Sequence, residues 1–219
     1  MTTIGSIKKK CAICGKISKH SEILSTNVLG SPDLDTRPPN MERSTIFTWV
    51  QRCPWCGYCA SDISKRIREA ENIIHSVSYK QQLNNSAFPE LANSFLCFSL
   101  ILENVGNYAG AGWECIHAAW SCDDANLNTC AQSCRKKAVI LLQKAREKGQ
   151  SFAKRTGAEE TIMADLLRRS GQFELALKVC NDGLKKNPEK IISDILRFQK
   201  ILIGKSDVAC HTIAEANDI

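Results

Sequence analysis

The stretch Cys53-Pro54-Trp55-Cys56-Gly57-Tyr58 carries two cysteines separated by two residues, with a glycine directly after the second. Cys11-Ala12-Ile13-Cys14-Gly15 repeats this arrangement. The spacing lets both thiolates of one tight turn face a single tetrahedral ion, and the glycine lets the chain turn back with a positive φ. Two such turns supply the four ligands of a closed site. We therefore expect one structural Zn²⁺ bound by Cys11, Cys14, Cys53 and Cys56, although four thiolates also suit iron.

Other interpretations of these cysteines stay open. All four could instead be small core residues, but this interpretation does not account for two copies of one Cys-x-x-Cys-Gly motif. A redox dithiol would need a strand–helix pattern of the thioredoxin type, which surrounds neither pair. Cys59 and His20 are near enough in sequence to compete as ligands, but tetrahedral zinc is complete with four.

The composition is that of an ordinary globular chain, with 219 residues, 43% of them hydrophobic and 24% charged. A formal net charge of +6 is compatible with nucleic-acid binding but does not argue for it. Twelve cysteines would indicate disulfides in a secreted chain, yet residues 1–10 are polar and lysine-rich. The most apolar stretch, 95–102, is too short to span a membrane. We expect a cytoplasmic protein without membrane association.

Residues 1–61 are predicted to form a small zinc-ribbon module. They lack helical periodicity and hold four of the six prolines. Residues 19–28 and 45–51 have the β-branched and aromatic character of short strands, and the second runs directly into Cys53. Metal would replace most of a hydrophobic core here, so the module is expected to unfold without its ion.

The insert between the two cysteine pairs is 38 residues long, against about 15 to 20 in common zinc sites. It includes Gly30 to Pro39, which is dense in turn-forming residues and too polar to be core. Asp33, Asp35 and Arg37 in this loop could hold a ligand or a second cation. We favour the simpler interpretation, in which the aspartates cap turns and Arg37 pairs with one of them on the surface.

Residues 62–219 are predicted to be entirely helical. Asp62 can cap a helix whose apolar positions recur at steps of three and four as far as Val77. Further helices are expected from residue 89 to about 105, and over 108–121, 127–148 and 188–203.

An internal repeat lies within the helical part. Gly106-x-Tyr108-x-x-Ala111-x-x-x-Cys115-x-x-Ala118 recurs 65 residues later as Gly171-x-Phe173-x-x-Ala176-x-x-x-Cys180-x-x-Gly183. A glycine in the turn, an aromatic after it and small residues at the helix contact are typical of a packed helical hairpin. The pattern resembles the tetratricopeptide repeat, whose period is about 34 residues, although the intervening segment lacks the signature. The predicted fold class is mainly α: a small N-terminal zinc ribbon followed by an all-helical, tetratricopeptide-like array.

The remaining cysteines carry less information. Cys115, Cys122, Cys130 and Cys134 could form a second metal site. However, Cys115 and Cys180 occupy the same position in the two repeats, which favours small core residues over ligands.

Taken whole, the chain resembles the bacterial DUF2225 family. The matching residues are the two Cys-x-x-Cys-Gly motifs, the Asp33-x-Asp35 region, and Tyr58 and Ala60 after the second motif. The resemblance implies a zinc-ribbon head on a helical repeat body and supplies no catalytic residues.

Three functions remain as hypotheses. The leading one is a non-enzymatic interaction protein whose helical hairpins bind a protein or peptide partner, because no nucleophile–base–orienter set is recognisable. The second is nucleic-acid binding, for which lysines 8–10, 16 and 19 and the aromatic residues Trp55 and Tyr58 are candidates. The third is a thiol redox or metal-dependent enzyme, which would need a low-pKa thiol or an open coordination position. The pattern leaves the oligomeric state open.

Overall fold

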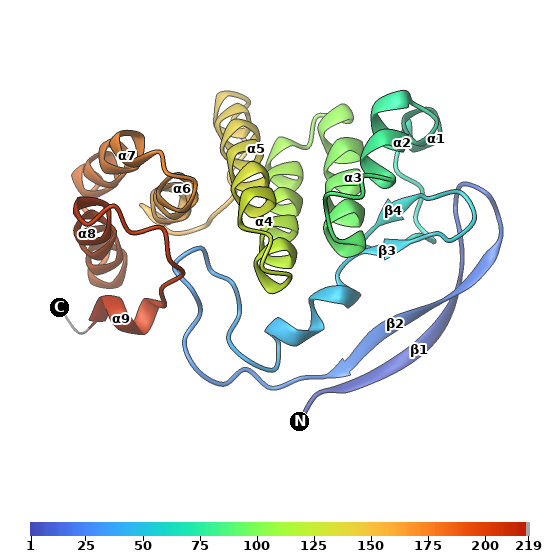
Figure 1. Ribbon diagram of the computed structural model, residues 1–219, viewed down its shortest axis with the longest axis horizontal. Helices are drawn as coiled ribbons and strands as arrows, with labels where there is room; N and C mark the ends of the chain where they lie inside the picture. Colours follow the sequence, from blue (N-terminus) through green and yellow to red (C-terminus); the bar gives the residue numbers. More distant parts are fainter. Residues whose placement is uncertain (218–219) are drawn as a thin grey trace.

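Two short β-hairpins form the N-terminal part of the computed structural model, which describes residues 1–217 (Figure 1). Strands β1 (Thr3–Lys10) and β2 (Ile17–Ser25) pair antiparallel, with the first cysteine pair in the turn between them. Strands β3 (Gln51–Arg52) and β4 (Cys59–Ala60) pair likewise around the second cysteine pair. The two cysteine motifs therefore lie in equivalent hairpin turns.

Helices make up the rest of the fold, and neighbours in sequence pack side by side (Figure 1). They are α1 (Ala70–Ile74), α2 (Val77–Leu83), α3 (Glu90–Asn104), α4 (Tyr108–Asp124), α5 (Asn128–Glu147), α6 (Ala158–Arg169), α7 (Phe173–Lys185), α8 (Lys190–Gly204) and α9 (Ile213–Asn217). The fold class is thus mainly α with a small β head, as predicted. Among the described helices, none combines the length and apolarity needed to cross a membrane.

The strand predicted over residues 45–51 is wrong for most of its length. A 3-10 helix, η1 (Arg43–Thr48), takes its place. The Thr45 hydroxyl donates to the Glu42 carbonyl at 2.7 Å and the Thr48 hydroxyl donates to the Thr45 carbonyl at 2.8 Å. These local bonds favour tight turns over a strand despite the β-branched side chains.

The long helix predicted from Asp62 is also wrong, because the structure forms only the short helices α1 and α2 there. Asp62 closes a turn instead, since its Oδ1 accepts the Ser64 amide at 3.0 Å. Glu69 adopts a positive φ of 60°, which no helix interior tolerates. Ser76 then starts a new helix by accepting the Tyr79 amide.

The two copies of the sequence repeat occupy equivalent places in two helix pairs. Gly106 and Gly171 lie in the α3–α4 and α6–α7 turns with φ of 79° and 78°. Cys115 and Cys180, at the same distance along the chain after each glycine, are fully buried. Helix α6 had no separate counterpart in the predicted elements, and the assignment to tetratricopeptide repeats stays a prediction.

The larger of two hydrophobic core clusters runs from the β region into the helices. Tyr58 and Phe95 belong to the same cluster of buried side chains. The hydroxyl of Tyr79 in α2 donates to the Gly57 carbonyl at 2.9 Å and accepts the Cys59 amide at 3.1 Å. The division at residue 61 stays a prediction, but the packing is continuous across it.

Most of the loop of residues 30–39, including Asp33, Asp35 and Arg37, is buried, so the expectation of a polar turn on the surface is wrong. Residues 32–34 of the loop pair with residues 211–213. The Leu34 amide donates to the His211 carbonyl at 2.9 Å. Leu34 also packs among Ile195, Leu202 and Ala216 of α8 and α9. The loop thus runs beneath the helices toward the C-terminal end of the array (Figure 1).

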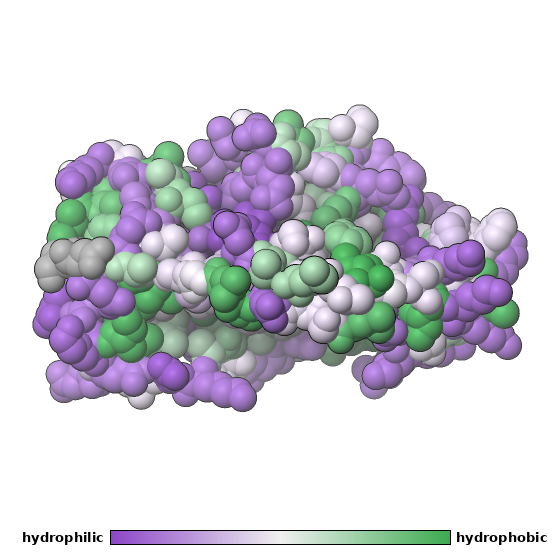
Figure 2. All heavy atoms as spheres, turned by 90° about the horizontal axis from the view of Figure 1, so that it is seen from below, coloured by the Kyte–Doolittle hydropathy of each residue, from purple (hydrophilic) through white to green (hydrophobic). Residues whose placement is uncertain are grey.

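The underside of the molecule, where β1, β2 and this loop lie, carries patches of apolar residues between polar stretches (Figure 2).

Candidate functional site

Four cysteine side chains converge where the two hairpin turns meet. Among the described residues, Cys11, Cys14, Cys53 and Cys56 have their sulfur atoms all within 4.8 Å of one another. The Sγ atoms of Cys11 and Cys56 are 3.7 Å apart, and those of Cys14 and Cys53 are 3.6 Å apart. A tetrahedron with zinc–sulfur bonds of about 2.3 Å has sulfur–sulfur edges of about 3.8 Å. The donor set therefore fits a tetrahedral, thiophilic metal ion.

The two turns are built by the same local bonds. Gly15 donates its amide to the Cys11 carbonyl and Gly57 donates to the Cys53 carbonyl, both at 2.9 Å. Their φ angles are 72° and 76°, in the region that glycine adopts without strain. At Gly57 the space is also restricted, because an added Cβ would lie 2.5 Å from Leu83 Cδ2. Each glycine thus turns the chain so that both sulfurs of its motif face the same point.

Hydrogen bonds from the backbone act on the thiols. Burial raises the pKa of Cys53, and amide hydrogen bonds from Cys56 and Trp55 partly oppose it. Burial alone would raise the pKa of Cys14. Hydrogen bonds from the Lys16 amide and the neighbouring Cys53 thiol outweigh this effect, so the pKa is lowered. Metal binding requires deprotonated thiols, and a bound cation supplies the charge that holds all four as thiolates.

Other sulfur and imidazole groups near the turns are engaged elsewhere. The Cys59 thiol donates to the Gly57 carbonyl at 3.3 Å. His20 Nε2 is hydrogen-bonded to the Ser18 hydroxyl at 2.8 Å. With four sulfurs already converging, the arrangement has the closed ligand set of a structural site.

Asp33, Asp35 and Arg37 lie far from the cysteines and bind helix side chains. Asp35 is completely buried and its Oδ2 accepts the Trp120 indole N–H at 2.7 Å. Arg37 donates to both carboxylate oxygens of Asp124, at 2.6 and 2.7 Å. The expected pairing of Arg37 with a loop aspartate through its side chain is therefore wrong. Only its amide contacts Asp35, at 3.2 Å, in the predicted turn.

The loop meets a cluster of buried charges that the sequence analysis missed. Arg169 of α6 donates to Asp35 at 3.4 Å and to Asp123 of α4 at 2.9 Å. Arg135 of α5 binds the same Asp123 through both carboxylate oxygens. In the sequence, Arg135 and Arg169 stand at core-facing positions of their helices, which could have indicated buried charges. The spacing of the two arginines does not indicate that both lie near one loop.

Electrostatics separates the buried Asp35 from the half-buried Asp123. Burial, together with nearby Asp165, raises the pKa of Asp35 despite the opposing charge of Arg169. Burial also acts on Asp123, but Arg135 and Arg169 outweigh it and lower its pKa. Asp123 is therefore the more firmly ionised member.

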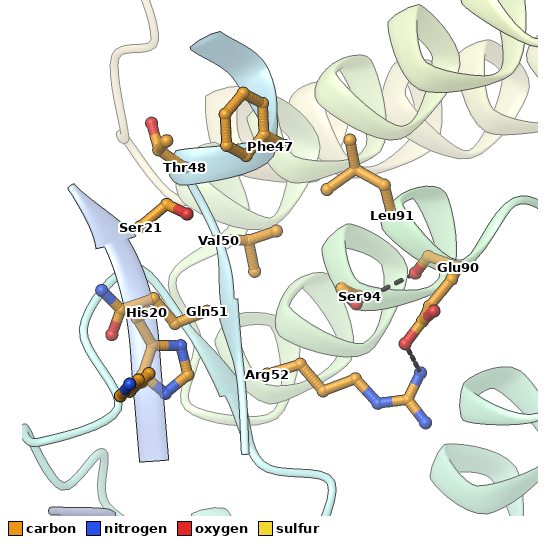
Figure 3. A pocket seen from close by; sticks show the side chains of 11 residues that line it. His20, Ser21, Phe47, Thr48, Val50, Gln51, Arg52, Glu90, Leu91 and Ser94 are labelled. Carbon is orange, nitrogen blue, oxygen red and sulfur yellow. Dashed lines mark hydrogen bonds and ion pairs between the residues drawn. The ribbon is translucent and has the colours of Figure 1, made fainter. Parts of the chain in front are cut away.

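A cavity of about 410 Å³ opens between β2, η1 and α3 (Figure 3). Phe47, Val50 and Leu91 form its apolar side. On its polar side, Arg52 pairs with Glu90 at 3.3 Å. Burial, followed by the charge of Lys9, lowers the pKa of His20. The cavity thus joins the first hairpin to the helices and offers both apolar and charged contacts.

The fold and the cysteine cluster define a helical protein with a small β head, built around four cysteines that could hold a metal ion. A family model described as an uncharacterized protein conserved in bacteria (DUF2225) matches residues 6–203, so the chain belongs to this family. No curated protein and no solved structure matches the chain.

Proposed function

We propose that the protein is a zinc-binding, non-enzymatic interaction protein, and that an extended acidic segment of a partner protein docks on the β1–β2 hairpin. The observation that carries this proposal is the pair of unpartnered strand edges. Within residues 1–217, β1 and β2 form a two-stranded sheet of their own, so each has one free edge. A long free edge offers backbone donors and acceptors to an added strand.

The charge of the outer hairpin face supports an acidic partner. Lys8 lies directly opposite Lys19 in the register, and both are exposed. Like charges at facing positions repel, and Lys10 adds a third cation beside them. A carboxylate-bearing segment would relieve this repulsion.

Apolar side chains around the same hairpin support a protein partner. The exposed large apolar residues of this region are Met1, Ile4, Ile17, Leu24, Val28, Leu29 and Phe47. The underside of the molecule, where β1 and β2 lie, shows apolar patches between polar stretches (Figure 2). Several such residues near one sheet favour burial by another protein.

The metal ion would cross-link this hairpin to the body of the protein. Cys11 and Cys14 join β1 and β2, and the same ion would be held by Cys53 and Cys56, which are anchored on the helical core. The only ion pair from the hairpin to the body among the described residues joins Lys9 to Asp62 at 2.9 Å. Zinc would thereby fix the orientation of the hairpin, because a two-stranded hairpin alone is only marginally stable.

The helical face proposed from the sequence has less room for a partner. Its α4 and α6 side chains Trp120 and Arg169 are bound by Asp35 of the chain's own loop. Trp49 adds an edge-on contact with Trp120. This internal occupation favours the hairpin as the docking surface.

Nucleic acid is the second candidate, supported by one specific contact. The Lys16 ammonium lies 4.5 Å from the centroid of the Trp55 ring, and that ring is 61% exposed. A basic and an aromatic group side by side could bind a phosphate and stack on a base.

The test uses full-length, zinc-loaded protein with two fluorescent probes: a peptide of alternating glutamate and valine, and a mixed-sequence single-stranded oligonucleotide. Anisotropy should show saturable peptide binding that is lost in Lys8→Glu/Lys19→Glu. Lys185→Glu/Lys190→Glu is the matched control, because both lysines are exposed and lie on helices away from the hairpin. Ile17→Ser/Leu24→Ser should weaken the peptide more than the oligonucleotide.

Three results would overturn the proposal: no peptide binding, equal loss in the control, or tighter and steeply salt-dependent oligonucleotide binding, which would establish the second candidate instead. Dimers that disappear in Lys8→Glu/Lys19→Glu would show that a second copy, and not another protein, covers the hairpin.

A further inference from the structure

The cavity of about 410 Å³ between β2, η1 and α3 borders the outer edge of β2 (Figure 3). Three consecutive residues of this strand, Lys19, His20 and Ser21, line it, and within residues 1–217 no residue of β1 does. Neighbouring side chains of a strand point to opposite faces, so contact with three in a row places the cavity at the edge of the strand and not over one face. The cavity therefore lies on the side of β2 that β1 does not cover.

The same edge of β2 has backbone groups that no other strand binds. Within the described part of the chain, residues 17–25 make no backbone hydrogen bond other than those to β1. Such groups can pair with an extended segment of another protein, which adds a strand to the sheet. A segment paired here would pass along the cavity.

One side of the cavity is apolar. Phe47, Val50 and Leu91 approach it from η1, from the residues after η1 and from α3 (Figure 3). The Phe47 side chain is 44% exposed, so covering it would remove apolar surface from water. The volume lies near the lower end of the range of about 300 to 1,000 Å³ found for small-molecule pockets. It is ample for one large apolar side chain.

The charged residues of the lining favour a carboxylate beside that apolar side chain. Lys19 is exposed and faces Lys8 across the hairpin. Arg52 is paired with Glu90 at 3.3 Å, and the Glu90 side chain is 81% exposed, so this pair is weak. His20 adds no charge at neutral pH, because burial lowers its pKa. Two cations against one carboxylate leave the lining with one positive charge in excess.

From the unpaired edge, the apolar wall and the excess charge, we propose that the docked segment pairs with β2 and inserts one side chain of leucine or phenylalanine size into this cavity. Alternate side chains of an extended segment point the same way, so the two neighbours of the inserted residue lie on the outer face. There Lys8 and Lys19 are exposed and attract carboxylates. The segment recognised is thus acidic, large apolar, acidic. This inference rests on the proposed docking of an acidic segment on the hairpin, and it adds the strand edge and the side chain that is selected.

Fluorescence anisotropy of full-length, zinc-loaded protein tests it with alternating glutamate–valine peptides in which one central valine is kept or replaced by phenylalanine, leucine or alanine. The phenylalanine or the leucine peptide should bind about tenfold more tightly than the alanine peptide, the order expected for burying one large apolar side chain. Phe47→Ser removes part of the apolar wall and should reduce this ratio to below about threefold. Ile140→Ser is the matched control, because Ile140 is 64% exposed but lies on α5, outside the lining.

A second pair of variants obstructs the cavity instead of removing its wall. Ser21 and Ser25 are both exposed residues of β2, but only Ser21 lines the cavity. Ser21→Tyr should abolish the preference for a large central residue, and Ser25→Tyr should keep it.

Equal affinity for all four peptides, lost in Lys8→Glu/Lys19→Glu, would overturn this inference and leave the docking on the hairpin intact. Absence of binding by every peptide would overturn both. Equal changes in cavity and control variants would also contradict the inference, since a general effect on the hairpin would then explain them. Dimers lost in Ser21→Tyr and kept in Ser25→Tyr would show that a second copy, and not another protein, covers this edge.

Discussion

Replacing Asp35 by alanine should destabilise the whole fold, although this residue lies in a loop. Its carboxylate is completely buried and accepts three hydrogen bonds. The donors are the Trp120 indole at 2.7 Å, the Arg37 amide at 3.2 Å and the Arg169 guanidinium at 3.4 Å. Alanine would leave these donors without their acceptor and would remove the loop's anchor on α4 and α6.

The magnitude follows from the groups left behind. A buried donor without an acceptor costs about 1–3 kcal/mol, and breaking one side of a buried ion pair costs about 3–5 kcal/mol. Part of this is offset, because burial already disfavours the ionised form and raises the pKa of Asp35. We expect a loss of about 3 kcal/mol, which lowers Tm by about 6–12 °C in a chain of this length. Asp35→Asn keeps an acceptor for Trp120, so its loss should be about half as large.

Urea unfolding of zinc-loaded protein, followed by circular dichroism and tryptophan fluorescence, measures these losses. Glu71→Ala is the control, because it removes only an exposed ion pair with Arg66 and should cost less than about 0.5 kcal/mol. A loss below about 1 kcal/mol in Asp35→Ala would refute the reasoning, since the loop would then contribute no more than a surface contact. Equal losses in Asp35→Ala and Asp35→Asn would show that charge, and not the indole hydrogen bond, is the source.

Three further predictions concern the metal, the pH and helix packing. Chelation or Cys53→Ser should lower the temperature of a single cooperative unfolding transition, because the core is continuous across residue 61. A separate helical transition at an unchanged temperature in calorimetry would contradict this. The Ser64 hydroxyl and Lys9 lower the pKa of Asp62 to about 2, so its stabilisation is complete above its unfolded value of 3.8 and lost as the pH falls toward 2. The stability difference between wild type and Asp62→Asn, expected below about 1 kcal/mol, should therefore vanish over that range in acid titrations. Gly112→Ala should cost about 1 kcal/mol because its Cβ would lie 2.5 Å from Leu142 Cδ2, whereas Gly204→Ala, with open space, should not destabilise; equal effects in thermal melts would rule out the steric cause.

The parts of the structure that follow from local chemistry were predictable from the sequence. The two Cys-x-x-Cys-Gly motifs placed four sulfurs in two turns, and the structure brings these sulfurs together. Apolar periodicity located α3, α4, α5 and α8. Helix α3 is buried on nearly all sides and not on one face alone. The identity of the ion as zinc stays a prediction, since the geometry of four sulfurs does not distinguish it from iron.

Errors arose where short-range hydrogen bonds compete with propensity. The β-branched and aromatic residues 45–48 favour a strand, but the hydroxyls of Thr45 and Thr48 donate to the carbonyls three residues earlier in the chain. Aspartate is a common residue at helix N-caps, so Asp62 was expected to cap a helix. Its carboxylate instead accepts the Ser64 amide in a turn and pairs with Lys9 of β1. The partner that decides its role lies 53 positions away in the chain, so no local window contains the information.

The loop of residues 30–39 shows why polarity alone does not predict exposure. Asp33, Asp35 and Arg37 are each costly to bury alone, and the local sequence suggests pairing within the loop rather than contacts with distant helices. In the fold, Asp33 pairs with Arg43 at 2.6 Å, and Asp35 and Arg37 reach α4. The partners of Asp35 and Arg37 lie on α4 and α6, far along the chain, so no window around the loop contains them. A partner competing for this face of the helices would have to replace every one of these bonds, whereas the hairpin can be engaged without breaking any of them.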